Sequence, residues 1–256
     1  MGKCKAGQYI KLTIPSITRF ETHPFTLSGC PEDGVLQLHI KSLGDWTRRV
    51  YDLAVQDELE SCKIHVVGPF VTRTSEVANY ANLVLVGAGV GATPFTSVLE
   101  SMLKKSSMED RCVDFHWIVG NQQAARSWFP GLLQSIEDCS SDLSIRVTIW
   151  YTGGRMLHSA TQKGLFDFSN FLYREKLGKE ILTGIRVKNL NVAARFGRPC
   201  WKAVLHSHMK MTTITKPIGV FCCGPQGLVQ DVNSACDEMS SKARPVNFHC
   251  EHFNSW

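Results

Sequence analysis

The first part of the chain alternates between apolar and polar positions in short runs that end at turn residues. Four such runs are visible, at residues 8–14, 25–28, 35–41 and 64–67. Short alternating runs bounded by Gly, Pro and Asp predict the strands of an antiparallel barrel. We therefore predict an antiparallel β-barrel domain over residues 1–75, truncated at its N-terminus because a barrel needs more strands than these.

The pattern changes at about residue 76 to strands that alternate with stretches of helical period. Apolar runs at 83–86, 115–119, 145–151 and 219–222 predict buried strands, and the run at 246–250 predicts an edge strand. Helical periods follow Thr93 and span 128–136 and 228–239. This order predicts an α/β domain with a parallel sheet over 76–256, and the glycine motifs considered below make it an expected nucleotide-binding domain. The segment 153–199 shows neither pattern, and we expect a long irregular insertion that is either functional or partly disordered.

Composition narrows the class of protein and of partner. The 256 residues are 43% hydrophobic and 20% charged, as in an ordinary globular protein. The formal net charge of +5 fits contact with phosphates or with an anionic membrane, although charge alone favours the simpler interpretation of a slightly basic soluble surface, and no nucleic-acid partner is expected. The ten cysteines and nine histidines show no metal-ligand spacing, so no metal site is predicted. No apolar run approaches the ~20 residues of a membrane helix, so we expect this region itself to be soluble.

Two apolar runs, far apart in the chain, stop abruptly at glycines. The first leads into Gly87-Ala88-Gly89-Val90-Gly91-Ala92-Thr93-Pro94, and the second leads into Cys223-Gly224-Pro225. Ligands of open α/β sheets bind at the carboxyl ends of strands, so two such ends predict one elongated ligand, a dinucleotide. Thr93 is expected to cap a helix whose free N–H groups face a pyrophosphate. Glycines at such a junction are as often packing devices, and that interpretation stays open.

Other motifs each have a functional and a structural interpretation. His23-Pro24-Phe25-Thr26 could hold a flavin, or it could start a strand with a core Phe. His39-x-Lys41 before Gly44-Asp45-Trp46-Thr47 could bring a cation and a helix N-terminus to a pyrophosphate, or it could form a capped turn over a buried Trp. Arg198, between a Gly and a Pro, could grip a phosphate or be a solvated loop residue. Cys223 could lie at a nicotinamide or be a packing thiol.

In this order the motifs resemble the cytosolic dehydrogenase region of the NADPH oxidase family, within the ferredoxin–NADP reductase-like flavoproteins. The resemblance covers nearly the whole chain, and its His-Pro-Phe-Thr and Gly-Arg-Pro-x-Trp elements are specific to this family and its ferric-reductase relatives. It implies FAD and NADPH as cofactors. It implies FAD contacts at His23, Pro24, Phe25, Thr26, His39, Lys41, Trp46 and Thr47. It implies NADPH contacts at Gly89, Gly91, Thr93, Pro94, Gly224, Pro225 and, for the 2′-phosphate, Arg198.

The same resemblance implies a reaction. Cys223 would lie beside the nicotinamide, and Phe253 would stack on the flavin until the nicotinamide displaces it. Hydride would pass from NADPH to FAD, and electrons would then reach membrane haems and reduce O2 to superoxide or hydrogen peroxide. The partners would be the haem-bearing membrane domain of a full-length protein, with this region on its cytosolic side, and cytosolic regulators. A ferric-chelate reductase module and a non-catalytic remnant with an incomplete flavin site are the alternatives.

Some positions depart from the pattern of the family. Gly120-Asn121 stand where the family has an Arg that helps grip the 2′-phosphate, and Arg126 is the nearest replacement, so the choice between NADPH and NADH stays open. Residues 254–256 extend past Phe253, and we expect their deletion to change little, whereas Phe253→Ala should tighten nicotinamide binding. We also expect weak FAD binding, because the first barrel strands are missing.

Overall fold

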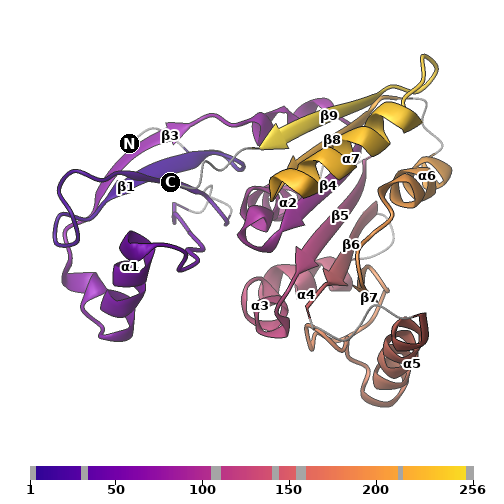
Figure 1. The fold of residues 1–256 in the computed structure, drawn as a ribbon, viewed down its shortest axis with the longest axis horizontal. Helices are drawn as coiled ribbons and strands as arrows, with labels where there is room; N and C mark the ends of the chain where they lie inside the picture. Colours follow the sequence, from indigo (N-terminus) through magenta and orange to yellow (C-terminus); the bar gives the residue numbers. More distant parts are fainter. Residues whose placement is uncertain are drawn as a thin grey trace.

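The computed structural model describes residues 4–29, 34–104, 111–139, 144–153, 160–212 and 216–251, which form two sheets. The sheet from the first part of the chain has three antiparallel strands, and the sheet from the second part has six parallel strands. Figure 1 shows the two sheets side by side, with the small one on the left. This arrangement confirms the predicted fold class, an antiparallel domain followed by an α/β domain.

The small sheet is organised around its first strand. Its strands are β1 (Tyr9–Thr13), β2 (His23–Thr26) and β3 (His65–Phe70), and β1 lies in the middle. Helix α1 (Asp45–Val55) buries Trp46 and Val50 in the same apolar cluster as Ile10 and Leu12 of β1. The helix begins after Gly44, as expected, because the Thr47 hydroxyl accepts the otherwise unpaired Gly44 N–H at 3.0 Å.

The strand predicted at 35–41 is wrong, because the structure has no strand there. Its alternation is real, since Leu36, Leu38 and Ile40 pack against the core of the small sheet. A ladder also needs a neighbouring backbone, and for this part of the described chain only one backbone hydrogen bond is formed, from the Ser28 N–H to the Gln37 carbonyl at 2.9 Å. The alternating pattern therefore reports which face is buried, not whether a strand pairs.

The large sheet is built from parallel strands covered on both faces. Its strands are β4 (Asn82–Ala88), β5 (Cys112–Val119), β6 (Ser144–Tyr151), β7 (Val192–Phe196), β8 (Ile218–Cys223) and β9 (Val246–Glu251). Their order across the sheet is β7-β6-β5-β4-β8-β9. The predicted edge strand at the carboxyl end of the sequence is confirmed as β9.

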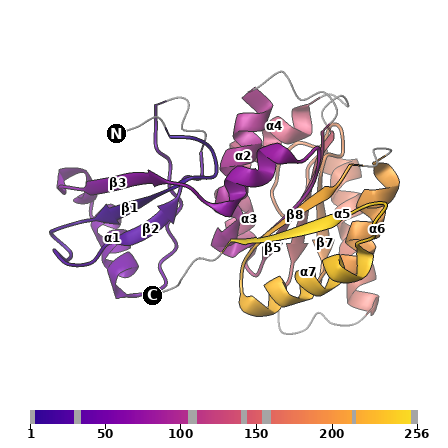
Figure 2. The same cartoon turned by 90° about the horizontal axis from the view of Figure 1, so that it is seen from above.

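Helices cover the two faces of this sheet, as Figure 2 shows from above. The helices are α2 (Thr93–Lys104), α3 (Gln122–Ser127), α4 (Pro130–Asp138), α5 (Ala160–Leu177), α6 (Trp201–Met211) and α7 (Gln226–Met239). Residues of α2, α3 and α4 share one apolar cluster with β4, β5 and β6. Residues of α6 and α7 form a second cluster with β4, β8 and β9 on the other face.

The prediction that 153–199 is a long irregular segment is wrong, because it contains helix α5 and strand β7. Helix α5 carries exposed apolar side chains, among them Leu165, Phe168 and Phe171. Its sequence therefore lacks the clear division into an apolar and a polar face by which a surface helix is recognised. Strand β7 has only five residues and lies at the sheet edge, so its pattern is short. Helix α6 was also not predicted from the sequence.

The predicted role of Thr93 as an N-cap is wrong. A 3-10 turn, η4 (Gly89–Ala92), runs directly into α2, and Thr93 already has helical angles of φ −55° and ψ −42°. Its hydroxyl donates to the Val90 carbonyl at 3.0 Å inside this turn. The buried face predicted for the helix is confirmed, since Phe95, Val98, Leu99 and Met102 are all buried.

Hydrogen bonds join the two sheets at α2 and at β9. The Gly7 N–H donates to the Ser97 hydroxyl at 2.9 Å, and the Thr96 hydroxyl donates to the Ser28 carbonyl at 2.9 Å. At the far edge, the Glu251 carboxylate accepts the N–H of Thr74, in the 3-10 helix η3 (Arg73–Asn79), at 3.1 Å. Helix α2, which follows the glycine turn, therefore touches both sheets.

Candidate cofactor-binding site

The two glycine-bearing strand ends meet in the structure. β4 and β8 are parallel neighbours, with Val86 opposite Cys222 and Gly87 opposite Cys223. Both strands therefore end at the same edge of the sheet, as the sequence predicted. A dinucleotide lying across two strand ends requires this adjacency.

The glycines at this junction divide into packed and open positions. A Cβ on Gly91 would lie 2.4 Å from the backbone oxygen of Cys223, and one on Gly224 would lie 3.0 Å from the Ala88 Cβ. These two glycines let the turn and the strand end pack together. Gly89 is different, because its φ of +53° favours glycine and no atom lies within 4 Å of its Cβ position. Gly89 therefore has room for a ligand to approach its backbone, and the Trp117 indole N–H holds its carbonyl at 3.1 Å.

Cys223 is buried between these elements, with 1% of its surface exposed. Burial raises the pKa of its thiol well above the ordinary value, so the side chain is a neutral thiol at pH 7. Such a thiol is neither a base nor a nucleophile under these conditions. If Cys223 lies beside a nicotinamide, its role is therefore to line the site and not to exchange a proton. That position beside the nicotinamide stays a prediction. Pro225 follows as the cap of α7.

A second cluster gathers the residues predicted to contact flavin. The His23 ring lies 4.3 Å from the Trp46 ring, and the Phe25 ring lies 5.8 Å from it, between centroids. Pro24 stands between them on β2, opposite Lys11 of β1. The structure thus brings β2 and the start of α1 together around one indole.

Two buried polar atoms in this cluster lack partners. The Thr26 hydroxyl and the indole N–H of Trp46 have no hydrogen bond with any described residue. A buried polar group without a partner costs about 1–3 kcal/mol, and native proteins rarely leave one unexplained. A bound group with hydrogen-bonding atoms, such as a flavin, would supply the missing partners. The residues present therefore fit the cofactor.

His39 makes contacts within the protein, and its predicted flavin contact stays a prediction. Its Nε2 donates to the Trp128 carbonyl at 2.9 Å, its Nδ1 lies 2.7 Å from the Ser28 hydroxyl, and its ring packs on Phe129 at 4.6 Å. Burial lowers its pKa, against the opposing effect of the bond to Trp128, so the ring is neutral at pH 7. The imidazole joins the small sheet to the region between α3 and α4. Lys41, close by in sequence, is exposed.

The two candidate arginines both follow carboxyl ends of strands in the large sheet. Arg198 lies in the loop after β7, where the Gly197 N–H donates to the Tyr151 carbonyl at 2.9 Å. Its side chain is exposed and makes no hydrogen bond or ion pair within the described ranges. Arg126 on α3 is exposed too, but its Nε donates to the Leu182 carbonyl at 3.2 Å. Arg198 is therefore the freer of the two to bind an anion.

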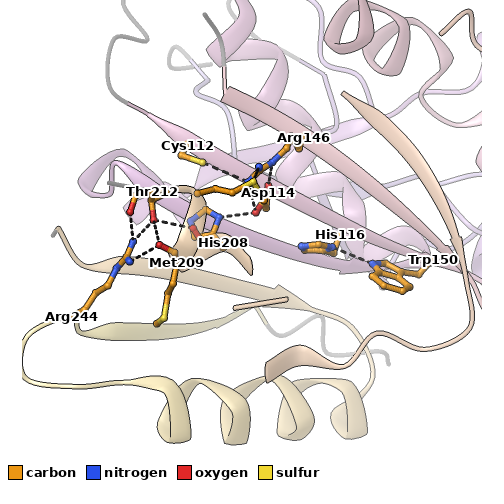
Figure 3. A network of polar contacts seen from close by, with 10 residues as sticks. Cys112, Asp114, His116, Arg146, Trp150, His208, Met209, Thr212 and Arg244 are labelled. Carbon is orange, nitrogen blue, oxygen red and sulfur yellow. Dashed lines mark hydrogen bonds and ion pairs between the residues drawn. The ribbon is translucent and has the colours of Figure 1, made fainter. Parts of the chain in front are cut away.

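A buried ion network on the α6 face was not predicted from the sequence (Figure 3). Asp114 of β5 receives a hydrogen bond from the fully buried His208 Nδ1 at 2.7 Å, and Arg146 of β6 donates to both of its oxygens at 2.7 and 2.9 Å. Burial alone would raise the pKa of Asp114, but His208 and then Arg146 outweigh it and lower the pKa to about 2. The sequence does show an Asp inside an apolar strand, and a buried carboxylate needs a partner. No local pattern indicates which residue that partner is.

This network predicts an acid-labile contribution to stability. Since the folded pKa of Asp114 lies below its ordinary value of 3.8, the contribution is complete above about pH 5 and is lost as the pH falls towards about 2. We expect Asp114→Asn to lower the free energy of unfolding by about 2 kcal/mol at pH 7 and by about half of that at pH 3. Urea unfolding at both pH values measures this. Equal losses at both would contradict an ionic contribution.

Some predicted features lie outside the described residues. These are Phe253, which was expected to cover the flavin, and residues 254–256. Among the residues that the structure does describe, no group of three or more His, Cys, Asp and Glu could hold a metal ion. Within the same ranges, no helix combines the length and the apolar character needed to cross a membrane.

Two protein families match the chain. The family described as "Ferric reductase NAD binding domain" matches residues 80–237, and the one described as "FAD-binding domain" matches residues 1–74. NADPH oxidase 1 of Mus musculus is 33% identical over 259 residues, covering 96% of this chain and 40% of that protein. Respiratory burst oxidase homolog protein E of Arabidopsis thaliana is 30% identical over 98% of this chain and 31% of that protein. The chain thus spans less than half the length of these relatives.

Solved structures share the arrangement of the two sheets. The CS-b5R domains of human Ncb5or, in their NAD+ form, superpose with a TM-score of 0.56 at 17% identity, over 96% of this chain and 60% of that one. The flavohemoglobin from Malassezia yamatoensis with bound FAD and heme gives a TM-score of 0.53 at 18% identity, over 97% of this chain and 52% of that one. At such identities the likeness establishes the fold alone.

Proposed function

Because the chain belongs to the ferric reductase NAD-binding domain family and is a dehydrogenase region of the NADPH oxidase type, we propose that it transfers hydride from NADPH to FAD for delivery of electrons to membrane haems. It is an NAD(P)H-dependent flavoprotein oxidoreductase with FAD and NADPH as cofactors. The observation that carries the proposal is the meeting of β4 and β8 at one edge of the sheet, where Gly89 leaves its backbone open.

The small sheet would hold the flavin. In this proposal the hydroxyl of Thr26 and the indole N–H of Trp46 gain the partners that they lack, and His23, Pro24 and Phe25 form an aromatic and aliphatic wall. Lys41 and the N-terminus of α1, with Thr47, face the pyrophosphate of the cofactor. When bound, FAD accepts a hydride and can release electrons one at a time.

The large sheet would hold NADPH. Gly89 admits the pyrophosphate close to the backbone at the start of α2, while Gly91 and Gly224 keep the two strand ends in contact. Thr93 and Pro94 stand in the first turn of that helix. Arg198 binds the 2′-phosphate, because its exposed guanidinium has no competing partner in the parts of the chain that the structure covers. The neutral thiol of Cys223 lines the nicotinamide end without exchanging a proton.

The proposed final acceptor is O2, reached through haems in a membrane domain of the full-length protein, with superoxide or hydrogen peroxide as product. The names of the relatives, which are oxidases, support this acceptor. In this arrangement residues 1–75 bind FAD and 76–256 bind NADPH on the cytosolic side, within reach of cytosolic regulators. A ferric chelate is the alternative acceptor.

The test is direct reduction of flavin by the purified chain. With FAD kept in saturating excess, because its binding is expected to be weak, anaerobic addition of NADPH should bleach the visible absorbance of the flavin, and a dye acceptor should restore it. A chain that retains FAD but is not bleached by NADPH would overturn the dehydrogenase assignment. A chain that shows no FAD binding in calorimetric titration, even at saturating FAD, would support the non-catalytic alternative.

Thr26 gives a sharper test of the flavin site. We expect Thr26→Val to weaken FAD binding by about fivefold to tenfold, because one hydrogen bond of about 1 kcal/mol is lost. Without FAD the same change should leave stability equal or higher, since it removes an unpaired buried hydroxyl. Thr26→Ser keeps the hydroxyl and is the control. Calorimetric titration and thermal unfolding measure the two effects, and unchanged FAD affinity in Thr26→Val would remove Thr26 from the site.

A further inference from the structure

Helix α6 packs on an apolar cluster with β4, β8 and β9 through Trp201 and Leu205, and it also meets polar residues of β5 and β6. The residues of β5 and β6 that face the other helices are apolar, such as Phe115 and Ile149. On the α6 side the same strands present Asp114, His116 and Arg146. Parallel sheets are usually covered by apolar residues on both faces, so this face of β5 and β6 is unusual.

The polar face holds α6 near both of its ends, as Figure 3 shows for the end at His208. Near the end of the helix, His208 is bound to Asp114 at 2.7 Å, and Arg244 donates to the Met209 carbonyl at 2.8 Å. At its start, the Trp201 ring packs edge-on against the His116 ring, with centroids 6.0 Å apart.

His116 is itself held in place by strand β6. It accepts a hydrogen bond from the Trp150 indole N–H at 3.1 Å. Burial lowers the pKa of His116 to about 4, so the neutral ring keeps this acceptor role at pH 7. The ring that supports the first residue of α6 is therefore fixed by the sheet.

An ion pair fixes the position of a helix more sharply than apolar contacts do. Apolar side chains can repack when a helix slides or rotates by a residue, at a modest cost. A slide that moves His208 away removes one of the two partners of Asp114 and leaves the buried carboxylate with Arg146 alone. Only the observed position of α6 keeps both partners, and buried polar groups are known to fix the register of packed helices in this way.

The position of α6 also determines the position of Arg198. The loop from Gly197 to Cys200 joins β7 to α6, and Arg198 stands three residues before Trp201. At the β7 end the loop is tied by the bond from Gly197 to Tyr151. At its other end it continues into the helix, where the Val204 N–H donates to the Cys200 carbonyl at 3.0 Å. A shift of α6 would therefore move the Arg198 guanidinium, which makes no hydrogen bond or ion pair with the residues that the structure describes.

We propose that Asp114 and His208 are positioning residues for NADPH recognition: their ion pair fixes α6, and α6 holds the Arg198 loop where the guanidinium meets the 2′-phosphate. The inference rests on the proposed role of Arg198. It extends that role to Asp114 on β5 and His208 on α6, which are not among the residues proposed to contact the nucleotide.

The test compares two replacements of His208. His208→Leu fills the space but cannot donate to Asp114, whereas His208→Asn offers an N–H in place of Nδ1. Calorimetric titration with NADP+ and NAD+ measures binding without turnover. We expect His208→Leu to weaken NADP+ by roughly tenfold and NAD+ by less than about twofold, and His208→Asn to restore most of the NADP+ affinity.

A matched control separates positioning from general loss of stability. Leu133→Ala, in α4 on the opposite face, should lower the thermal midpoint without changing the ratio of the two affinities. Should His208→Leu fail to fold, Arg146→Gln loosens Asp114 from its more exposed side and should shift the ratio in the same direction by a smaller factor. Equal weakening of NADP+ and NAD+, or an unchanged ratio, overturns the positioning role.

The result also distinguishes this inference from the proposed function. If Arg198→Ala lowers NADP+ affinity selectively and the His208 variants do not, the positioning inference fails while the role of Arg198 stands. If Arg198→Ala has no selective effect, the proposed 2′-phosphate contact fails, and the inference fails with it.

Discussion

Replacing Gly91 by Ala is expected to weaken NADPH binding by about tenfold to a hundredfold and to lower the stability of the large domain. The added Cβ would lie 2.4 Å from the Cys223 oxygen and 3.0 Å from its carbonyl carbon. Both atoms belong to the backbone, so no side-chain rotation relieves the clash. Either the η4 turn must move away from β8 or the two strand ends must separate, and overpacking of this kind costs about 1–3 kcal/mol or more.

The measurement is calorimetric titration with NADPH together with thermal unfolding. Gly227→Ala in α7 is the matched control, because no atom lies within 4 Å of its Cβ position. The control should bind NADPH normally. Normal binding by Gly91→Ala would mean that the junction of the two strand ends does not form the nucleotide site.

Arg198→Ala should weaken NADPH much more than NADH, by about 1.5–3 kcal/mol, or roughly 10-fold to 150-fold in affinity. The reason is the loss of a charged hydrogen bond to a phosphate that only NADPH carries. Arg198 is exposed and has no competing hydrogen-bond or ion-pair partner among the described residues, so it is available for the contact, whereas Arg126 already donates to the Leu182 carbonyl.

The matched control for Arg198 is Arg195→Ala. Arg195 is also exposed and lies in β7, three residues earlier, so its loss removes the same charge without touching the loop. Affinities for NADPH and NADH measure both variants. Equal losses for the two nucleotides in Arg198→Ala would remove it from the 2′-phosphate site and direct attention to Arg126.

The sequence by itself determined the features that depend on local chemistry. Alternating and apolar runs predicted most strands of both sheets, because side-chain period follows backbone geometry. Glycines after the runs 83–86 and 219–222 predicted strand ends where the backbone has no side chain between it and a neighbour or ligand. The structure shows these two strand ends side by side. The order of motifs predicted the family. Roles assigned to individual cofactor-binding residues stay predictions, since they depend on a bound ligand.

Only the tertiary structure decided which partner each group meets. Segment 35–41 has the pattern of a strand but lacks a pairing neighbour, and Thr93 continues a turn instead of capping a helix. Asp114 reaches His208 across 94 residues, and no local pattern can name a partner at that distance. The partner of a strand or of a buried charge depends on where whole helices and strands lie in the folded protein. Those positions are set when helices pack on both faces of the sheet. For that reason the ion network beneath α6 was visible only in the folded chain.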